Sequence, residues 1–256
     1  MFAIFKREFI SYFKSPVGYI ALAIFSFLAG FSYSAKFSKA YIDMPSIIMS
    51  LCSFFIILIP IVTMGLLSED KRRGTDVIYY TSPIKLVYVV FGKFLAAVAL
   101  FGVLYLIVIV LMIVTKFYGG VINVSVLSAS LIFFCLVFLY VSIGIFASSF
   151  SESQIISAIV SFVFILLIQL LPTIGSFVSS AVMSVMGLFG NPSTNTLYKV
   201  SDSIVNAFSW LDPMQRFNTT NLGILNIISI FYCLSLTFFF LFLTYRMLEK
   251  KRWSQA

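Results

Sequence analysis

The most restrictive feature of the sequence is a set of six long segments that contain no charged residue. Their lengths are 21, 25, 22, 35, 46 and 29 residues. They are bounded by Lys14 and Lys36, Asp43 and Glu69, Lys93 and Lys116, Lys116 and Glu152, Glu152 and Lys199, and Arg216 and Arg246. A bilayer core about 30 Å thick requires about 20 apolar residues per helix, so each segment can hold at least one span. The sequence therefore predicts an all-α, polytopic membrane protein.

Composition excludes the soluble classes. Apolar residues make up 61% of the chain and charged residues 10%, whereas charged residues are about 25% of a typical globular domain. The chain has no histidine, which excludes His-based proton relays and His metal sites. Cys52, Cys135 and Cys233 each lie alone in an apolar run, so we expect neither a disulfide nor a metal site.

We place six transmembrane helices near residues 16–34, 44–67, 94–115, 126–148, 154–171 and 222–244, within a transmembrane domain that covers 16–256. Residues 173–189 are uncharged but rich in Gly and Ser. We expect them to form a re-entrant or outer-surface helix before the last span, within an external loop over 173–221. Pro60 and Pro172 are candidate positions for helix kinks.

Charge placement predicts the orientation in the membrane. With six spans and an inner N-terminus, 12 of the 17 Lys and Arg residues fall in inner segments. The other five are Lys36, Lys39, Lys116, Lys199 and Arg216. A seventh span over 173–189 would move the basic C-terminus to the outside and break this bias. We therefore expect six spans with both termini in the cytoplasm.

Residues 1–15 have the pattern of an amphipathic interface helix. Phe2, Phe5, Phe9 and Phe13 recur at helical spacing, and polar residues such as Arg7 fall on another face. Such a helix lies in the plane of the membrane interface with its apolar face in the lipid. The alternative is that this segment is only the positively charged flank of the first span.

The long inner loop over 68–93 is the most informative part of the sequence. Gly74 suits the left-handed position that ends a helix, and Thr75 can cap a new short helix with Asp76 in its first turn. Ser82 and Pro83 can start the next helix. The short helix would present an exposed apolar patch, typical of a docking surface. Its members are Val77, Ile78, Tyr79 and Tyr80. The alternative is a linker whose aromatic side chains lie among lipid headgroups.

At this loop the chain resembles the ABC-2-type transporter permeases. The sequence EDKRRGTDVIYYTSPIKLVYVVFGK over 69–93 carries a charged turn, "GT", a short helix, "TSP" and "GK" in the order typical of these permeases. The first 16 residues and FASSFSESQIISA over 146–158 are also similar to the family. WLDPMQRF over 210–217 and LTYRMLEKKRW over 243–253 resemble its gliding-motility-type branch.

The resemblance implies a six-span permease that pairs with a second copy or a paralogue and rests on two cytoplasmic ABC ATPase subunits. It implies that the short helix is the coupling helix. The residues it assigns to ATPase coupling are Gly74, Thr75, Asp76, Val77, Ile78, Tyr79 and Tyr80. The interface helix, with Phe5, Phe9 and Phe13, would form a second contact with the ATPase. An auxiliary membrane protein with an external domain is a further expected partner, and the bacterial cytoplasmic membrane is the expected location.

These points together predict the membrane-spanning permease subunit of a bacterial ABC exporter. The chain has no GxxxxGK[ST] phosphate-binding loop, so we expect it not to be an enzyme and expect ATP and Mg²⁺ in the partner ATPase. No acidic residue lies in the middle of a predicted span, which weighs against an ion-coupled transporter. Two alternatives remain open: a non-transporting membrane anchor for an ATPase machine acting on the envelope, and an ATP-independent carrier or channel. The sequence does not indicate the cargo.

Overall fold

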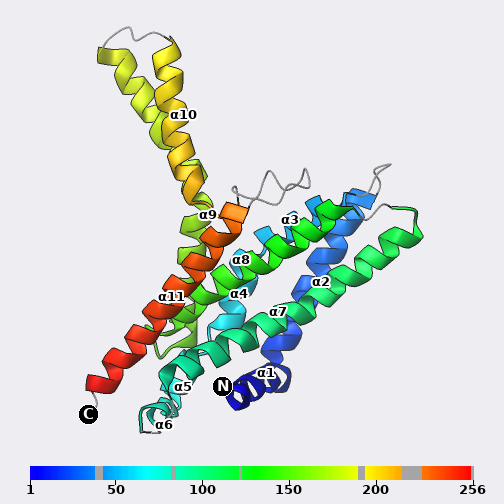
Figure 1. Cartoon of the computed structure of the whole chain (residues 1–256), viewed down its shortest axis with the longest axis vertical. Coiled ribbons are helices and arrows are strands. Elements are labelled where there is room, and N and C mark those ends of the chain that lie inside the picture. Colours follow the sequence, from blue (N-terminus) through cyan, green and yellow to red (C-terminus); the bar gives the residue numbers. More distant parts are fainter. Residues whose placement is uncertain (38–42, 82–84, 121–122, 190–193, 215–226, 255–256) are drawn as a thin grey trace.

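The computed structural model describes residues 1–37, 43–81, 85–120, 123–189, 194–214 and 227–254 (Figure 1). Every regular element in these residues is an α-helix, which confirms the all-α prediction. The elements are α1 (Phe2–Lys14), α2 (Pro16–Phe37), α3 (Met44–Ser53), α4 (Phe55–Thr63), α5 (Ser68–Arg72), α6 (Asp76–Thr81), α7 (Leu86–Phe117), α8 (Val124–Ser148), α9 (Gln154–Phe189), α10 (Thr194–Leu211) and α11 (Ile227–Ser254).

Five of these helices are long and apolar enough to cross a membrane: α2, α7, α8, α9 and α11. The segments Met44–Ser53 and Phe55–Arg72 meet the same test together but are bent by 53° where they join. The described residues therefore hold five candidate spans, or six if the bent pair crosses as one. The bend lies at Phe54 and not at Pro60, which lies inside α4.

The bundle is built around α8, most of whose residues are buried against α3, α4, α7, α9 and α11. Aromatic rings fill its centre: Phe55 of α4 lies 5.6 Å from Phe101 of α7 and 5.0 Å from Phe133 of α8, between ring centroids. Because lipid tails are as apolar as these side chains, close van der Waals packing is what holds such helices together.

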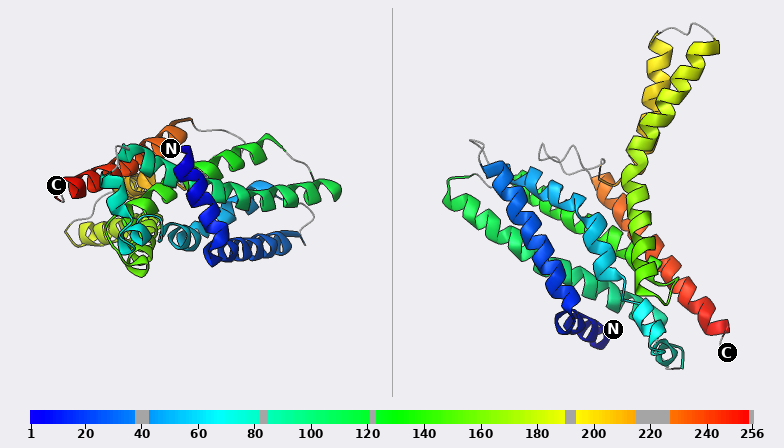
Figure 2. Two further views of the ribbon diagram at one scale, coloured as in Figure 1. Left: turned by 90° about the horizontal axis from the view of Figure 1, so that it is seen from below. Right: turned by 180° about the vertical axis from the view of Figure 1, so that it is seen from behind.

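The first helix lies across one end of the bundle. Figure 2 (left) shows α1 crossing the ends of the long helices, and α1 packs on α7 and α2. The chain turns at Ser15 and Pro16 into α2. Tyr12 is buried and its hydroxyl donates to the carbonyl of Val62 at 3.1 Å, which ties α1 to the second span. The predicted amphipathic helix is therefore present and docked on the bundle.

The largest departure from the sequence-based expectation concerns residues 173–189. We expected a separate re-entrant or outer helix after Pro172, but α9 continues through Pro172 to Phe189. It then packs against α10, and the two form a hairpin that projects from the bundle at the end opposite α1 (Figure 2, right). Packing against α10 supports α9 beyond Pro172, where we expected the helix to end.

A smaller difference concerns the third span. Its helix, α7, begins at Leu86 and not near Phe94, so Lys93 lies inside a helix and not at the end of the loop. Part of the last expected span, residues 222–226, and the expected helix start at Ser82 and Pro83 lie outside the described residues. The spans expected over 16–34, 126–148 and 154–171 lie within α2, α8 and α9, whereas the span expected over 44–67 is divided into α3 and α4.

Candidate functional site at the charged end of the bundle

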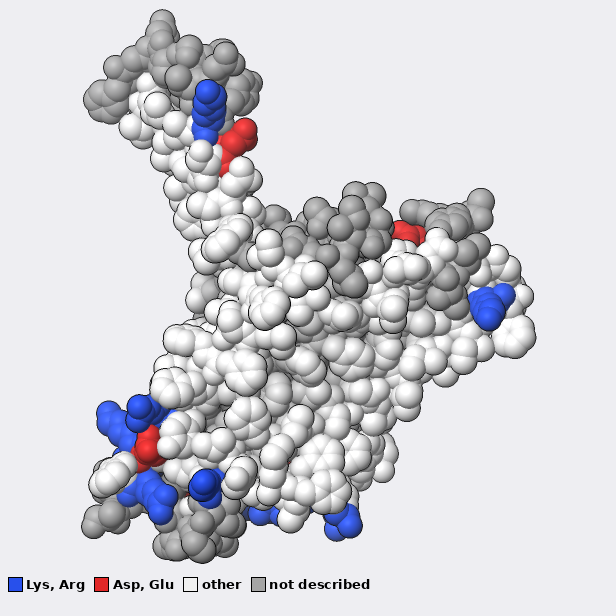
Figure 3. All heavy atoms as spheres, viewed as in Figure 1, with Lys and Arg blue, Asp and Glu red and all other residues white. Residues whose placement is uncertain are grey.

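Charged side chains gather at one end of the molecule. Figure 3 shows most visible Lys and Arg side chains at the end where, in Figure 1, both termini lie. We call this the charged end; it comprises α1, α5, α6, the start of α7 and the C-terminal part of α11. The coupling residues implied by the sequence resemblance lie here, so this end is the candidate site.

The turn between α5 and α6 has the geometry predicted for it. Gly74 has a positive φ of 66°, in the left-handed region. The amide of Gly74 donates to the carbonyl of Lys71 at 3.1 Å and that of Thr75 donates to the carbonyl of Asp70 at 2.9 Å. This pair of bonds is the Schellman motif, which satisfies the last carbonyls of a helix. Gly74 thus ends α5 and lets α6 start in a new direction.

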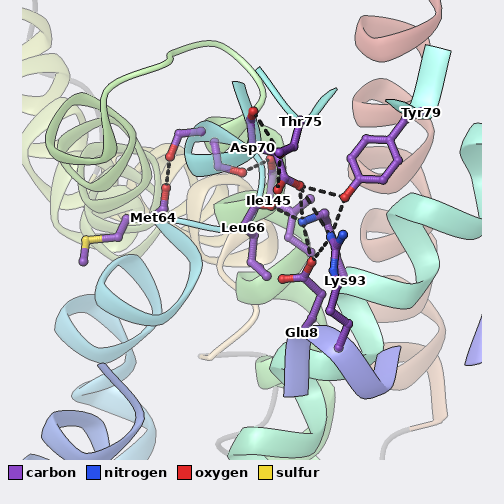
Figure 4. Close-up of polar contacts among 11 residues, drawn as sticks. Glu8, Met64, Leu66, Asp70, Thr75, Tyr79, Lys93 and Ile145 are labelled. Carbon is purple, nitrogen blue, oxygen red and sulfur yellow. Dashed lines mark hydrogen bonds and ion pairs between the residues drawn. The ribbon is translucent and has the colours of Figure 1, made fainter. Parts of the chain in front are cut away.

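Lys93 is the centre of the site (Figure 4). Its side chain is 1% exposed, and its ammonium contacts Glu8 Oε1 at 3.0 Å and Asp70 Oδ2 at 2.6 Å. It also donates to the carbonyl of Leu66. A lysine ammonium has three donors, and these three acceptors occupy all of them. A buried charge is tolerated only when it is paired in this way.

Asp70 joins the short helix to this lysine. Its Oδ2 accepts a hydrogen bond from the Tyr79 hydroxyl at 3.0 Å, and its Oδ1 accepts one from Thr75 Oγ1 at 3.1 Å. Burial raises the pKa of the Tyr79 hydroxyl, which therefore stays protonated and can donate to Asp70. Arg7 of α1 donates to the oxygen of the same tyrosine. We call Lys93 and its surrounding polar groups Arg7, Glu8, Asp70 and Tyr79 the buried ion network; Arg7 lies at its exposed edge.

The buried ion network connects four parts of the fold. Arg7 and Glu8 come from α1, Asp70 from α5, Tyr79 from α6 and Lys93 from α7. Beside Lys93, Gly92 allows α1 to approach α7 closely, because a Cβ there would lie 3.1 Å from Ile4 Cγ2. α1, α5 and α6 are therefore held to α7 by one set of contacts.

A second group of charges links the short helix to α11. Lys251 Nζ lies 3.9 Å from Asp76 Oδ2 and 3.9 Å from Glu152 Oε1. Lys71 donates to the carbonyl of Ser149 in the turn between α8 and α9. The ends of α8, α9 and α11 thus meet next to α6.

The structure corrects the expected orientation of the short helix. We expected Tyr79 to be exposed, but it is only 7% exposed and faces the buried ion network. Asp76 is also buried, at 8%, whereas Val77 is exposed, at 48%. The side chains of Ile78 and Tyr80 lie outside the described part of the chain. Thr75, the residue before α6, donates its hydroxyl to Asp70 Oδ1 at 3.1 Å.

The expected phenylalanine face of α1 is present as a row of rings, with Phe5 and Phe9 stacked and Phe9 and Phe13 in edge contact. Phe5 and Phe9 lie 5.9 Å apart and Phe9 and Phe13 lie 5.3 Å apart, between ring centroids. All three are partly buried against the core. Sequence reasoning assigned no specific role to Glu8, Asp70 and Lys93. The available signal was the position of Lys93 between Phe91 and Phe94, an apolar setting in which a lysine needs a partner.

Comparison with known proteins identifies the family. No curated protein matches the chain. Residues 2–253 match the family described as "ABC-2 family transporter protein". This match covers almost the whole sequence and includes the interface helix, the short helix and all the candidate spans. The chain belongs to the ABC-2 transporter family, whose members are membrane permeases of ABC transporters.

Proposed function

We propose that this chain is the membrane-spanning subunit of a bacterial ABC exporter and that the charged end receives force from separate ATPase subunits. Permeases of this family normally work with ABC ATPases. The main support for the proposal is the buried ion network. It connects α6 and α1 through Lys93 to the start of α7, a candidate membrane span. A push on α6 would then move the spans and not only the loop.

The surface that meets the ATPase follows from the orientation of α6. Tyr79 contacts Arg7 and Asp70, whereas Val77 is the exposed apolar side chain among those described in α6, so we propose that Val77 enters an apolar pocket of the partner. The exposed polar residues of α1, such as Lys6, would supply a second contact. ATP and Mg²⁺ would be bound by the partner, with both termini of this chain in the cytoplasm.

Other partners belong to the same proposal. Exporters of this type need a second permease, identical or paralogous, to enclose a path for cargo. The motifs over 210–217 and 243–253 favour the gliding-motility-type branch, for which an auxiliary membrane protein with an external domain is a further partner. Residues 215–217 of the first motif lie outside the described part of the chain.

A purification experiment tests the proposal. The tagged chain is isolated from its native membrane in mild detergent, and co-purifying proteins are identified by mass spectrometry and assayed for ATPase activity. We expect a stoichiometric ATPase. A folded chain that brings down no ATPase would contradict the proposal and favour the carrier or channel. An ATPase complex that causes no ATP-dependent redistribution of cargo would favour the anchor.

Val77→Asp tests the docking surface itself. A carboxylate cannot enter an apolar pocket without losing its hydration, so we expect co-purified ATPase to fall about tenfold or more. Val124→Asp is the matched control, since Val124 is 72% exposed and begins α8 at the opposite end of the bundle. Equal ATPase recovery with both variants would show that α6 does not dock through Val77.

A further inference from the structure

A cavity of about 430 Å³ opens at the charged end beside α1. Its walls come from the C-terminal half of α1, the start of α2, the end of α4, α5 and the first residue of α9. Gly65 leaves this space open: a Cβ there would meet only the ends of the Glu69 and Gln154 side chains, at 3.3 and 3.5 Å. The buried ion network reaches the cavity only through Glu8.

The cavity has an excess of positive charge that the protein does not neutralise. Lys14, Arg72 and Arg73 line it. Arg73 pairs with Glu69 at 2.5 Å, and Glu8 is occupied by Lys93 and Arg7. Lys14 and Arg72 are exposed and have no acidic partner among the described residues. Two cations therefore remain available to an anion.

The other side of the cavity is apolar. Val17 of α2 and Ile61 and Val62 of α4 line it. The apolar wall thus lies where α2 begins and α4 ends, and Lys14 and Arg72 lie at the ends of α1 and α5. A free phosphate ion would gain nothing from an apolar wall, whereas a phospholipid would place its glycerol and first methylenes there and its phosphate between the cations.

We propose that this cavity binds the phosphate-bearing headgroup of an anionic membrane lipid. Arg72 and Lys14 would hold the phosphate, and Val17 and Ile61 would contact the glycerol end of the acyl chains. A lipid bound there would lie between α1 and α4, and its occupancy would stabilise the docked position of α1. Lipid binding in this cavity requires neither the ATPase nor the cargo.

The test measures which lipids the purified chain retains. The chain is reconstituted in vesicles with equal amounts of phosphatidylglycerol and phosphatidylcholine, extracted in detergent, and analysed by native mass spectrometry. We expect retained phosphatidylglycerol in excess over phosphatidylcholine. Arg72→Gln should reduce this preference about fivefold, the effect of one basic residue near an anionic surface. Lys6→Gln is the matched control, since Lys6 is an exposed cation on α1 that does not line the cavity.

A cavity-filling variant and a competition experiment distinguish a lipid site from the alternatives. Gly65→Leu fills the cavity while keeping every charge, and we expect it to abolish the preference for phosphatidylglycerol. Competition with glycerol 3-phosphate distinguishes a lipid site from a site for free phosphate: we expect no displacement at millimolar concentration. An equal loss for Lys6→Gln and Arg72→Gln would overturn the proposal in favour of general surface attraction. Displacement by glycerol 3-phosphate, or an unchanged preference in Gly65→Leu, would overturn it as well.

Discussion

At the residue scale, the charged end depends on how Lys93 is paired. Its ammonium is buried between the carboxylates of Glu8 in α1 and Asp70 in α5 and the carbonyl of Leu66, in the turn between α4 and α5. Removing one partner from a buried ion pair costs more than the pair itself is worth, because the remaining charges lose their compensation. Lys93 is therefore compensated only when α1 and α5 are both docked on α7.

We predict that Lys93→Met destabilises the chain by about 3 kcal/mol, because Glu8 and Asp70 are left without their cation. The measurement is the thermal unfolding midpoint in detergent. Lys85→Met is the matched control, since Lys85 is exposed at the start of the same helix. Adding Glu8→Gln and Asp70→Asn to Lys93→Met should restore most of the loss. A midpoint equal to that of Lys85→Met would contradict the pairing.

At the element scale, the bundle relies on places where two helices come very close. Gly144 of α8 packs on Thr63 of α4, and a Cβ at Gly144 would lie only 2.2 Å from Thr63 Oγ1 and 2.8 Å from its Cβ. Small residues of this kind allow membrane helices to pack backbone against backbone. The structure identifies Thr63 as the neighbour of Gly144, which lies 81 positions away in the sequence.

Gly144→Ala should therefore separate α4 from α8. We expect a loss of about 1–3 kcal/mol, typical of an overpacked core, measured as a lower thermal midpoint. Gly102→Ala provides the control, because a Cβ at Gly102 in α7 has no atom within 4 Å. That variant should keep or raise the midpoint, since alanine favours helix over glycine. Equal midpoints for the two variants would show that the α4–α8 contact does not limit stability.

The length of α9 has a consequence that can be measured in intact cells. Its 36 residues extend about 54 Å at 1.5 Å per residue, well beyond a hydrocarbon core of about 30 Å. We expect Ser180→Cys, on the exposed face beyond Pro172, to react with a membrane-impermeant maleimide from the outside. Cys52, Cys135 and Cys233 are buried and should give little background. Protection of Ser180→Cys from the outer reagent would support a re-entrant segment.

At the scale of the whole molecule, the two ends of the bundle differ in chemistry. Both termini and most of the cationic side chains lie at the charged end, while the α9–α10 hairpin projects from the other (Figures 1 and 3). Basic residues favour the cytoplasmic side of a membrane. The tertiary structure thus brings the separate basic segments of the sequence to one side.

Reporter fusions test this arrangement. We expect a reporter placed after Ala256 and a reporter placed before Met1 both to score as cytoplasmic. Lys250→Cys, exposed near the end of α11, should be inaccessible to the outer maleimide that labels Ser180→Cys. Termini on opposite sides would require an odd number of spans, which would be met if the bent pair of α3 and α4–α5 did not cross the membrane as one unit.

Some features of this protein follow from local sequence alone. The uncharged runs set the helical membrane class, because backbone groups in lipid have to be satisfied within one helix. Gly74 fixes the end of α5, because only glycine adopts a positive φ at no cost. The spacing of Phe5, Phe9 and Phe13 sets the face of α1 that packs on apolar surface.

Other features depend on contacts between distant segments. Pro172 did not end α9, because packing against α10 supports the helix beyond it. Tyr79 is buried and not exposed, because Asp70 and Arg7 lie where only the folded bundle can place them. Lys93 could be recognised as a lysine in an apolar setting, but its partners are 85 and 23 positions away in the sequence. Local sequence sets which helices form, and the packing of those helices decides which charges are buried together.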